Sequence, residues 1–319
     1  MIIDIHTHGL AGFGSRSENP EDYLEMAAAM KSHGTDAFLP TLFPGPVDIM
    51  RAQLAAIKNA MEEQKKRSPL SSVGEGWERQ DSAVILGANL EGPFVNPLKK
   101  GALGPVPVDR LQTVDWHQVD GIFQPPSIEN LKRLIDGFED VVKVITIAPE
   151  LPGALELIEY CADAGIIVDM GHSDATFEQA RAGAKAGAMG VTHLFNAMSG
   201  LHHRNPGLAA YALMDDELYV EIIADGVHVH PEMLRLALKM KPAGKILLVS
   251  DSLAQAKTPE HPEAAPLYLP AEAGRAATLA GGGLSLMECV ERLTRLADAP
   301  PESAQRFASE NPQRFLAGK

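Results

Sequence analysis

The chain has 319 residues, 45% of them hydrophobic, and its 42 acidic residues outnumber its 28 basic residues, which gives a formal net charge of −14 at pH 7. This acidic balance argues against a nucleic acid or an anionic membrane as the main partner, because both bind a basic face. We expect neither a membrane span nor a signal peptide, because no run of 18 apolar residues occurs and no basic segment precedes an apolar stretch at the N-terminus.

Apolar runs of strand length alternate with helical patterns along the chain. Strands are predicted at residues 1–9, 35–41, 84–91, 141–148, 166–170, 190–193, 219–225 and 245–251. Helices are predicted at residues 21–33, 47–67, 128–138, 153–164, 175–186, 208–214, 233–241, 286–297 and 303–309. Loops are predicted at residues 10–20, 68–81, 96–120 and 252–283.

Eight strands, each followed by a helix or by a loop and a helix, are typical of a parallel sheet. This number of units in about 300 residues fits a (β/α)8 TIM barrel. The prediction is therefore an α/β fold with a single barrel domain over residues 1–319. An open, doubly wound sheet is the main alternative.

The first predicted strand ends in a His-x-His pair, His6 and His8. Side chains alternate along a strand, so both histidines project to the same side, about 7 Å apart by strand rise. Two imidazoles placed in this way can share one metal ion. Taken alone, the pair is explained equally well by a structural role, in which two histidines at a strand end make ordinary hydrogen bonds.

Other polar residues stand at the ends of predicted strands. Glu91 follows the third strand, His172 the fifth, His193 the sixth and Asp251 the eighth. Each of them alone has a structural explanation, such as a turn or helix cap. In a barrel, the carboxyl ends of the strands meet at one mouth, so these residues would converge with the His-x-His pair. This convergence favours the barrel over the open sheet. Four imidazoles and two carboxylates are ligands that suit zinc, iron or manganese.

A series of motifs from residue 4 to about residue 316 resembles the N-acetylglucosamine-6-phosphate deacetylases of the amidohydrolase superfamily. The motifs are DIHTHG at 4–9, LEGPF at 90–94, KKGA at 99–102, GHSDAT at 171–176, THLFNAMSGLHHRNPG at 192–207, ADGVHV at 224–229, LVSD at 248–251, LAGG at 279–282 and ASENPQRFL at 308–316. Members of this family usually also carry a small β-sandwich, which we expect to be absent here.

The resemblance implies a role for each strand-end residue. Glu91, His172 and His193 would bind the principal metal. His6 and His8, with Glu91 as a bridge, would form a second metal position that only some members possess. Asp251 would act first as general base and then as general acid. The implied cofactor is a divalent metal, with zinc expected before iron or manganese, and one or two ions bound.

The resemblance also implies a substrate pocket. Its sugar-binding residues would be Asn196, Ala197, Asp225, His228, Leu279, Ala280 and Gly281. Arg204 of a neighbouring subunit, together with His228, would hold the phosphate, so a homodimer is expected. Ala102 and Leu103 would lie beside the substrate. The family usually has a histidine that contacts the amide carbonyl at the second of these two positions, and Leu103 cannot donate this hydrogen bond.

The expected function is removal of the acetyl group from N-acetylglucosamine 6-phosphate, which gives glucosamine 6-phosphate and acetate. One alternative is an amidohydrolase for another N-acyl sugar or for a cyclic amide. Many such enzymes use a carbamylated lysine at the end of the fourth strand, whereas Lys143 lies early in its strand. A second alternative is a non-catalytic sugar-phosphate-binding barrel.

Cys161 and Cys289 form no Cys-x-x-Cys motif, which fits a reducing cytoplasm.

Overall fold

The fold is seen in a computed structural model that describes residues 1–67, 81–103, 121–261, 267–269 and 278–318. Its main sheet is built from parallel strands. In spatial order these are β1 (Ile3–Thr7), β4 (Ala37–Leu42), β6 (Ala88–Leu90), β7 (Val142–Ile147), β8 (Ile167–Met170), β9 (Gly190–Val191), β10 (Tyr219–Ile223) and β11 (Ile246–Val249). The spatial order follows the chain order, as in a barrel.

Two backbone hydrogen bonds close this sheet into a ring. The Asp251 amide donates to the carbonyl of His6 at 3.0 Å, and the His8 amide donates to the carbonyl of Ser252 at 2.8 Å. They join the carboxyl ends of β1 and β11, the first and last strands of the sheet. The (β/α)8 barrel is thus confirmed, and the open doubly wound sheet is excluded.

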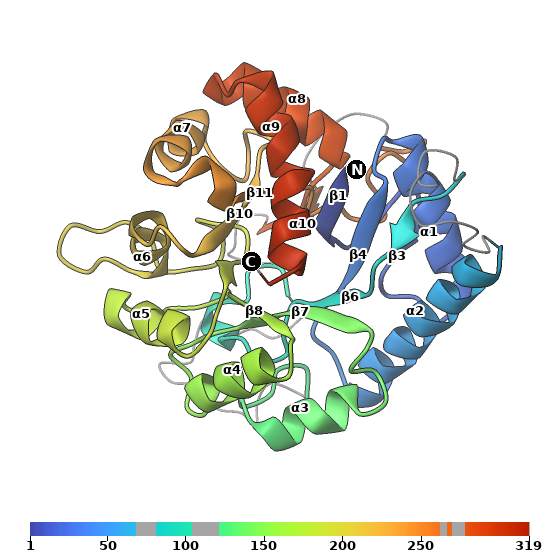
Figure 1. The fold of residues 1–319 in the computed structure, drawn as a ribbon, viewed down its shortest axis with the longest axis horizontal. Coiled ribbons are helices and arrows are strands. Elements are labelled where there is room, and N and C mark those ends of the chain that lie inside the picture. The colour runs from blue at the N-terminus through green and yellow to red at the C-terminus, as the bar shows by residue number, and fades with distance from the viewer. Residues whose placement is uncertain (68–80, 104–120, 262–266, 270–277, 319) are drawn as a thin grey trace.

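Helices surround the ring of strands (Figure 1). They are α1 (Pro20–Ser32), α2 (Val47–Arg67), α3 (Ile128–Ile135), α4 (Ala154–Asp163), α5 (Phe177–Lys185), α6 (Leu208–Met214), α7 (Pro231–Met240), α8 (Leu286–Ala297), α9 (Pro301–Phe307) and α10 (Glu310–Leu316). Capping boxes begin α5 and α8, because the hydroxyls of Thr176 and Ser285 accept the amide of the residue three positions later. None of the described helices is long and apolar enough to cross a membrane.

Two apolar cores stabilise the barrel. The larger core lies between the strands and the surrounding helices. A smaller core fills the inside of the barrel and contains Ile5, Val144 and Leu247 together with Phe315 of α10. The Phe315 ring lies 5.1 Å from the ring of Tyr219, at the start of β10. Helix α10 therefore closes the amino-terminal end of the barrel and leaves the opposite end open for a site.

The strand predicted at residues 84–91 is divided into β5 (Val84–Ile85) and β6. Strand β5 pairs with β4, and β6 pairs with both β4 and β7. Gly87 lies between the two pieces with φ +144°, and a Cβ built there would be 2.4 Å from the Val141 carbonyl. Only glycine permits this close backbone approach, so the strand is interrupted at that residue.

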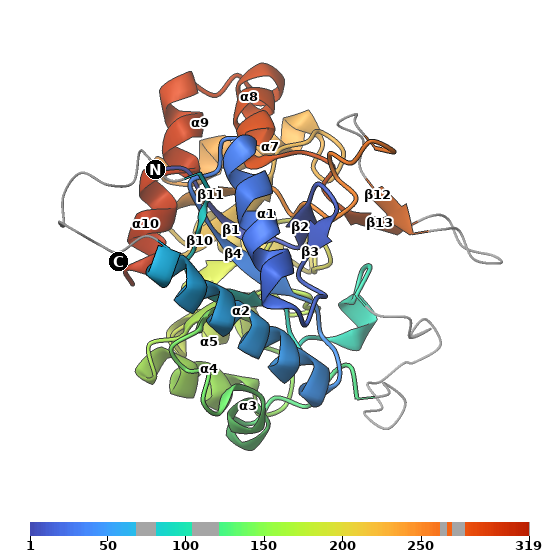
Figure 2. The ribbon, with the colours of Figure 1, turned by 90° about the vertical axis from the view of Figure 1, so that its right-hand side faces the viewer.

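Two predicted loops contain short antiparallel hairpins, so their assignment as loops was wrong in part. Strand β2 (Gly9–Leu10) pairs with β3 (Phe13–Gly14), and β12 (Leu267–Leu269) pairs with β13 (Thr278–Gly281). Both hairpins lie at the end of the barrel opposite the chain termini (Figure 2). A third predicted loop, at residues 96–120, contains a short 3-10 helix at Pro97–Lys99. Outside the described residues lie 68–80 of the loop predicted at 68–81 and 104–120 of the loop predicted at 96–120.

Candidate active site

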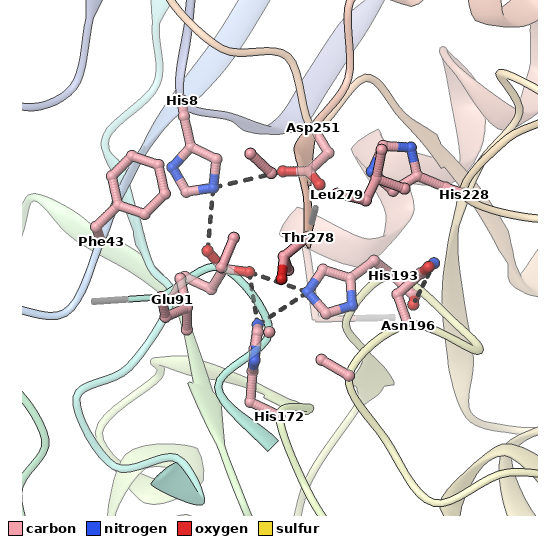
Figure 3. Close-up of a pocket in the computed structure, with 15 residues that line it drawn as sticks. His8, Phe43, Glu91, His172, His193, Asn196, His228, Asp251, Thr278 and Leu279 are labelled. Carbon is pink, nitrogen blue, oxygen red and sulfur yellow. Dashed lines mark hydrogen bonds and ion pairs between the residues drawn. The ribbon is translucent and has the colours of Figure 1, made fainter. Parts of the chain in front are cut away.

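The structure brings the six strand-end residues together at the open end of the barrel. Figure 3 shows all of them except His6. Glu91, which follows β6, lies at their centre. Its Oε1 atom is 2.9 Å from the Nε2 atoms of both His172 and His193, and its Oε2 atom is 3.0 Å from His8 Nε2. His6 Nε2 lies 3.6 Å from Glu91 Oε1. The prediction that the side chains of His6 and His8 project to the same side agrees with this geometry.

These side chains form two groups that share Glu91, and each could hold a metal ion. One group adds His6 and His8, the other adds His172 and His193, and within each group the potential ligand atoms lie within 4.8 Å of one another. His6 Nε2 is buried and has no hydrogen-bond partner among the described residues. A buried imidazole nitrogen without a partner, in a set of imidazoles and a carboxylate, fits a transition-metal ion.

Hydrogen bonds at Nδ1, on the side of the imidazole that faces away from Glu91, orient His8 and His172. Nδ1 of His8 lies 2.8 Å from the Thr41 carbonyl oxygen, and Nδ1 of His172 lies 2.9 Å from the Lys99 carbonyl oxygen. When Nδ1 donates to a carbonyl, Nε2 keeps its lone pair for the centre of the site. The second-sphere contacts therefore favour the tautomer that a metal ligand needs.

His6 is oriented by Glu221, a residue that the sequence reasoning missed. Its Oε2 atom lies 2.9 Å from His6 Nδ1 and accepts a hydrogen bond from the backbone amide of His193 at 3.1 Å. Glu221 is fully buried within β10. One signal for it was present in the sequence, because a charged residue within the apolar run Tyr219–Ile223 needs a partner.

The backbone contributes to the convergence at three strand ends. His172, His193 and Asp251 have positive φ angles of 45°, 29° and 47°. Residues other than glycine rarely adopt this left-handed conformation, and it is found at functional sites where the surroundings hold it. The turn after each strand places the side chain over the mouth of the barrel.

Electrostatics hold the carboxylates ionised. Burial alone would raise the pKa of Glu91, but the charge of His8 and hydrogen bonds from His172 and His193 bring it well below the usual value. Burial also opposes the ionisation of Asp251, and a hydrogen bond from His8 together with the charge of His6 lowers the pKa of Asp251. Burial alone would lower the pKa of His8, but the charges of Glu91 and Asp251 and hydrogen bonds to both carboxylates together raise it.

A cavity of about 210 Å³ opens over this cluster. Of the predicted site residues, those that line it are His8, Glu91, Ala102, Leu103, His172, His193, Asn196, Ala197, His228, Asp251, Leu279 and Ala280. Phe43, Gly101 and Thr278 also line it and were not predicted. The Phe43 ring stacks on the imidazole of His8 with ring centroids 3.7 Å apart and an interplanar angle of 10°.

Four predicted residues lie outside the cavity wall. His6 is buried beneath the cavity, against Glu221. Asp225 supports the wall, because its Oδ2 atom lies 2.6 Å from Nδ1 of His228. Gly281 belongs to β13, and Arg204 stands in an exposed loop before α6. A single chain therefore does not bring Arg204 to the cavity.

Two further positions bear on the chemistry. Leu103 is 3% exposed and packs in an apolar cluster with Val95 and Phe123, so it offers the substrate an apolar wall. Lys143 lies at the start of β7, and its Nζ atom donates to the Asp140 carbonyl at 2.7 Å. A carbamylated lysine ligand would stand at the mouth of the barrel, and Lys143 lies away from it.

A parallel barrel with a carboxylate shared by two pairs of histidines at the carboxyl ends of its strands defines a metal-dependent barrel hydrolase. The chain belongs to the amidohydrolase family, whose model matches residues 2–317.

Curated relatives match over nearly the whole chain. The sequence is 31% identical over 319 residues to an N-acetylgalactosamine-6-phosphate deacetylase of Escherichia coli O157:H7, covering 98% of this chain and 76% of the relative. It is also 31% identical over 320 residues to an N-acetylglucosamine-6-phosphate deacetylase of Vibrio furnissii, covering 99% and 72%. A crystal structure of N-acetyl-D-glucosamine-6-phosphate deacetylase from Mycobacterium smegmatis superposes with a TM-score of 0.80 at 27% identity, covering 99% of this chain and 77% of that one.

Proposed function

We propose that the protein is a metal-dependent deacetylase that hydrolyses N-acetylglucosamine 6-phosphate to glucosamine 6-phosphate and acetate. The observation that carries this proposal is the cluster in which Glu91 contacts His8, His172 and His193 beneath the carboxylate of Asp251. Curated relatives with this activity in their names support the choice of substrate, and so does a Mycobacterium smegmatis variant of the same enzyme that was solved with N-acetyl-D-glucosamine 6-phosphate.

We propose that Glu91, His172 and His193 hold the principal ion and that His6, His8 and Glu91 hold a second one. Zinc is the first candidate, followed by iron or manganese. Such an ion, when bound, polarises the amide carbonyl and lowers the pKa of a water molecule. The chain itself supplies the orientation of the ligands, through the hydrogen-bond partners of their Nδ1 atoms.

Asp251 would move the protons of the reaction. Its Oδ1 atom lies 3.4 Å from His8 Nε2, and its lowered pKa leaves it ionised at neutral pH. An ionised carboxylate at this place can accept a proton from the attacking water and then donate it to the departing amine. The amino group of the sugar leaves in its neutral form, which avoids an unstable amide anion.

The sugar would lie on the side of Asn196, Ala197 and His228, where the chain offers polar and small groups. The pKa of His228 is raised, since the hydrogen bond and charge of Asp225 outweigh its burial. A protonated His228 can bind a phosphate oxygen. We propose that Arg204 from a second subunit completes the phosphate site, and that the protein is a cytoplasmic homodimer of single-domain subunits over residues 1–319.

N-acetylgalactosamine 6-phosphate is a second candidate substrate, because the relative from Escherichia coli O157:H7 carries that name. The two sugars differ only in the orientation of one hydroxyl. The position of Lys143 speaks against an amidohydrolase that uses a carbamylated lysine, since no lysine occupies the end of β7.

The test is a release assay for acetate with protein loaded with zinc, iron or manganese. Both phosphorylated sugars and their unphosphorylated forms are offered as substrates. We expect acetate from at least one phosphorylated sugar and a much lower kcat/KM without the phosphate. A metal-loaded protein that releases no acetate from any of them would show that the proposed activity is wrong.

A further inference from the structure

A second cavity of about 600 Å³ adjoins the catalytic cavity. The two share His8, Phe43, Ala102 and Ala280 in their walls, so the space over the metal ligands continues past His8 and Phe43. The rest of the second wall comes from the β2–β3 hairpin with residues 15–17 after it, from Asp22, from residues 253–255 after β11, and from Leu269 of β12. This space is larger than the methyl of an acetyl group requires.

The direction of this cavity corresponds to the acyl side of a bound amide. An amide is planar, and its acyl and nitrogen substituents normally extend in opposite directions from the C–N bond. His8 and Phe43 line both cavities, whereas Asn196 and His228 line only the catalytic cavity. Figure 3 shows the two pairs apart, the first at the upper left and the second at the right. A substrate whose sugar occupies the side of Asn196 and His228 therefore directs its acyl chain past His8 and Phe43, into the second cavity.

Arg16 places a positive charge in this cavity. Its guanidinium carbon lies 4.2 Å from the centroid of the Phe43 ring. His8 already covers one face of that ring, so the guanidinium must cover the other face to avoid overlap. The result is a stack of imidazole, phenyl and guanidinium that runs from a metal ligand to a cation. Within the described part of the chain, no carboxylate pairs with Arg16, and Asp22 accepts instead from Ser17 at 2.5 Å and from Asn19 at 3.3 Å.

Arg16 is suited to a carboxylate. A guanidinium presents its N–H donors in a planar fork and can bind both carboxylate oxygens with parallel charge-assisted hydrogen bonds. Because Arg16 lines the second cavity and has no carboxylate partner among the described residues, its donors are available to an acidic group that enters there.

We propose that the second cavity is an acyl subsite, which accepts N-acyl groups longer than acetyl that end in a carboxylate bound by Arg16. The inference rests on the proposed function, because it uses the same metal cluster and the same sugar side. It extends the substrate class from N-acetyl to N-carboxyacyl amino sugar phosphates. The products of such a reaction are a dicarboxylate and the amino sugar phosphate.

The experiment compares two acyl groups of equal size and different charge. Glucosamine 6-phosphate carrying an N-succinyl group is compared with the compound in which an amide replaces the terminal carboxylate, and with the N-acetyl compound. We expect the native protein to hydrolyse the succinyl compound with a kcat/KM roughly 10- to 100-fold above that of its amide counterpart, the scale of a charge-assisted hydrogen bond. Arg16→Gln should bring this ratio close to one, and Arg16→Lys should leave an intermediate ratio because lysine cannot bind in a bidentate manner.

Arg67→Gln is the matched control, since Arg67 is exposed on α2 and contacts Glu21 at 3.7 Å, outside both cavities. It should keep the native ratio. Activity on the amide counterpart reports whether each variant is folded.

The outcomes separate this inference from the proposed function. Hydrolysis of the N-acetyl compound alone, or a ratio that Arg16→Gln leaves unchanged, overturns the acyl subsite and leaves the deacetylase intact. If Arg16→Gln weakens all phosphorylated substrates equally, Arg16 serves the phosphate and the subsite is wrong. Hydrolysis of the succinyl compound without the acetyl compound supports the subsite and replaces the proposed substrate, and hydrolysis of neither overturns both.

Discussion

Glu91 determines the electrostatics of the site at the scale of single residues. Its two oxygens contact three imidazoles at 2.9 to 3.0 Å, and a fourth at 3.6 Å. Opposite charges this close stabilise one another strongly when they are buried, but an unpaired member would be costly. Protons on the imidazoles and a metal ion are therefore alternative ways to balance the same carboxylate.

Asp251 differs from the other strand-end residues, because it is proposed to move protons. Asp251→Asn should keep the fold and at least one metal ion, yet lose on the order of 10²-fold or more in kcat, the usual contribution of a general acid–base group. Steady-state kinetics and metal analysis of the same sample check this. Asp140→Asn, on the exposed surface near Lys58, is the matched control and should have the native rate. A near-normal rate in metal-replete Asp251→Asn would remove Asp251 from the mechanism.

Glu221 should determine the affinity of the second metal position. Its carboxylate orients His6 from behind, and the loss of such a partner typically weakens metal binding by roughly 10- to 100-fold. Glu221→Gln should retain the ion at Glu91, His172 and His193 and bind the second ion more weakly, as measured by metal titration. Glu217→Gln, with a carboxylate 92% exposed, is the control. An unchanged second affinity would mean that Glu221 only stabilises the fold.

At the scale of secondary-structure elements, the sequence predicted the barrel well because buried strands and amphipathic helices alternate with clear periods. The strand-end residues could be found for the same reason, since each follows an apolar run. Phe43 and Thr278 could not be found, because nothing near them in the sequence distinguishes them from core or loop residues. The β2–β3 hairpin was missed because its two-residue strands depend on distant contacts, such as the Ala11 amide donating to the Ala256 carbonyl at 2.7 Å.

The pairing of β8 with β9 depends on a glycine. A Cβ built on Gly190 would be 2.2 Å from the Asp169 Oδ1 atom and 3.3 Å from the Phe315 ring. Gly190→Ala should therefore force the interior of the barrel apart and lower the free energy of unfolding by about 1–3 kcal/mol, as overpacking of cores does. Denaturant unfolding measures this change. Gly244→Ala is the control, because its Cβ would meet nothing within 4 Å, and equal stability of the two variants would contradict the predicted clash.

For the whole molecule, the site couples metal binding to stability and pH. Burial alone would lower the pKa of His6, but the charge of Glu221 and its hydrogen bond, together with the charges of Glu91 and Asp251, raise it well above 6.5. The pKa of His8 is raised for a similar reason. A group whose pKa is raised by folding stabilises the folded state below its unfolded pKa, and this contribution is lost as the pH rises through the folded pKa. The metal-free protein should therefore lose stability above about pH 6.5.

A bound metal displaces these protons, so the metal-loaded protein should escape that loss. We expect the difference in Tm between zinc-loaded and EDTA-treated protein to widen as the pH rises from about 6.5 through the raised pKa values of His6 and His8. Burial raises the pKa of Asp4 to about 7, but Asp4 is not among the proposed ligands and to a first approximation affects both forms in the same direction. Thermal unfolding at several pH values measures the difference, with His6→Asn expected to reduce its slope. A difference in Tm that stays constant over this range would show that the imidazoles of His6 and His8 do not exchange protons for metal.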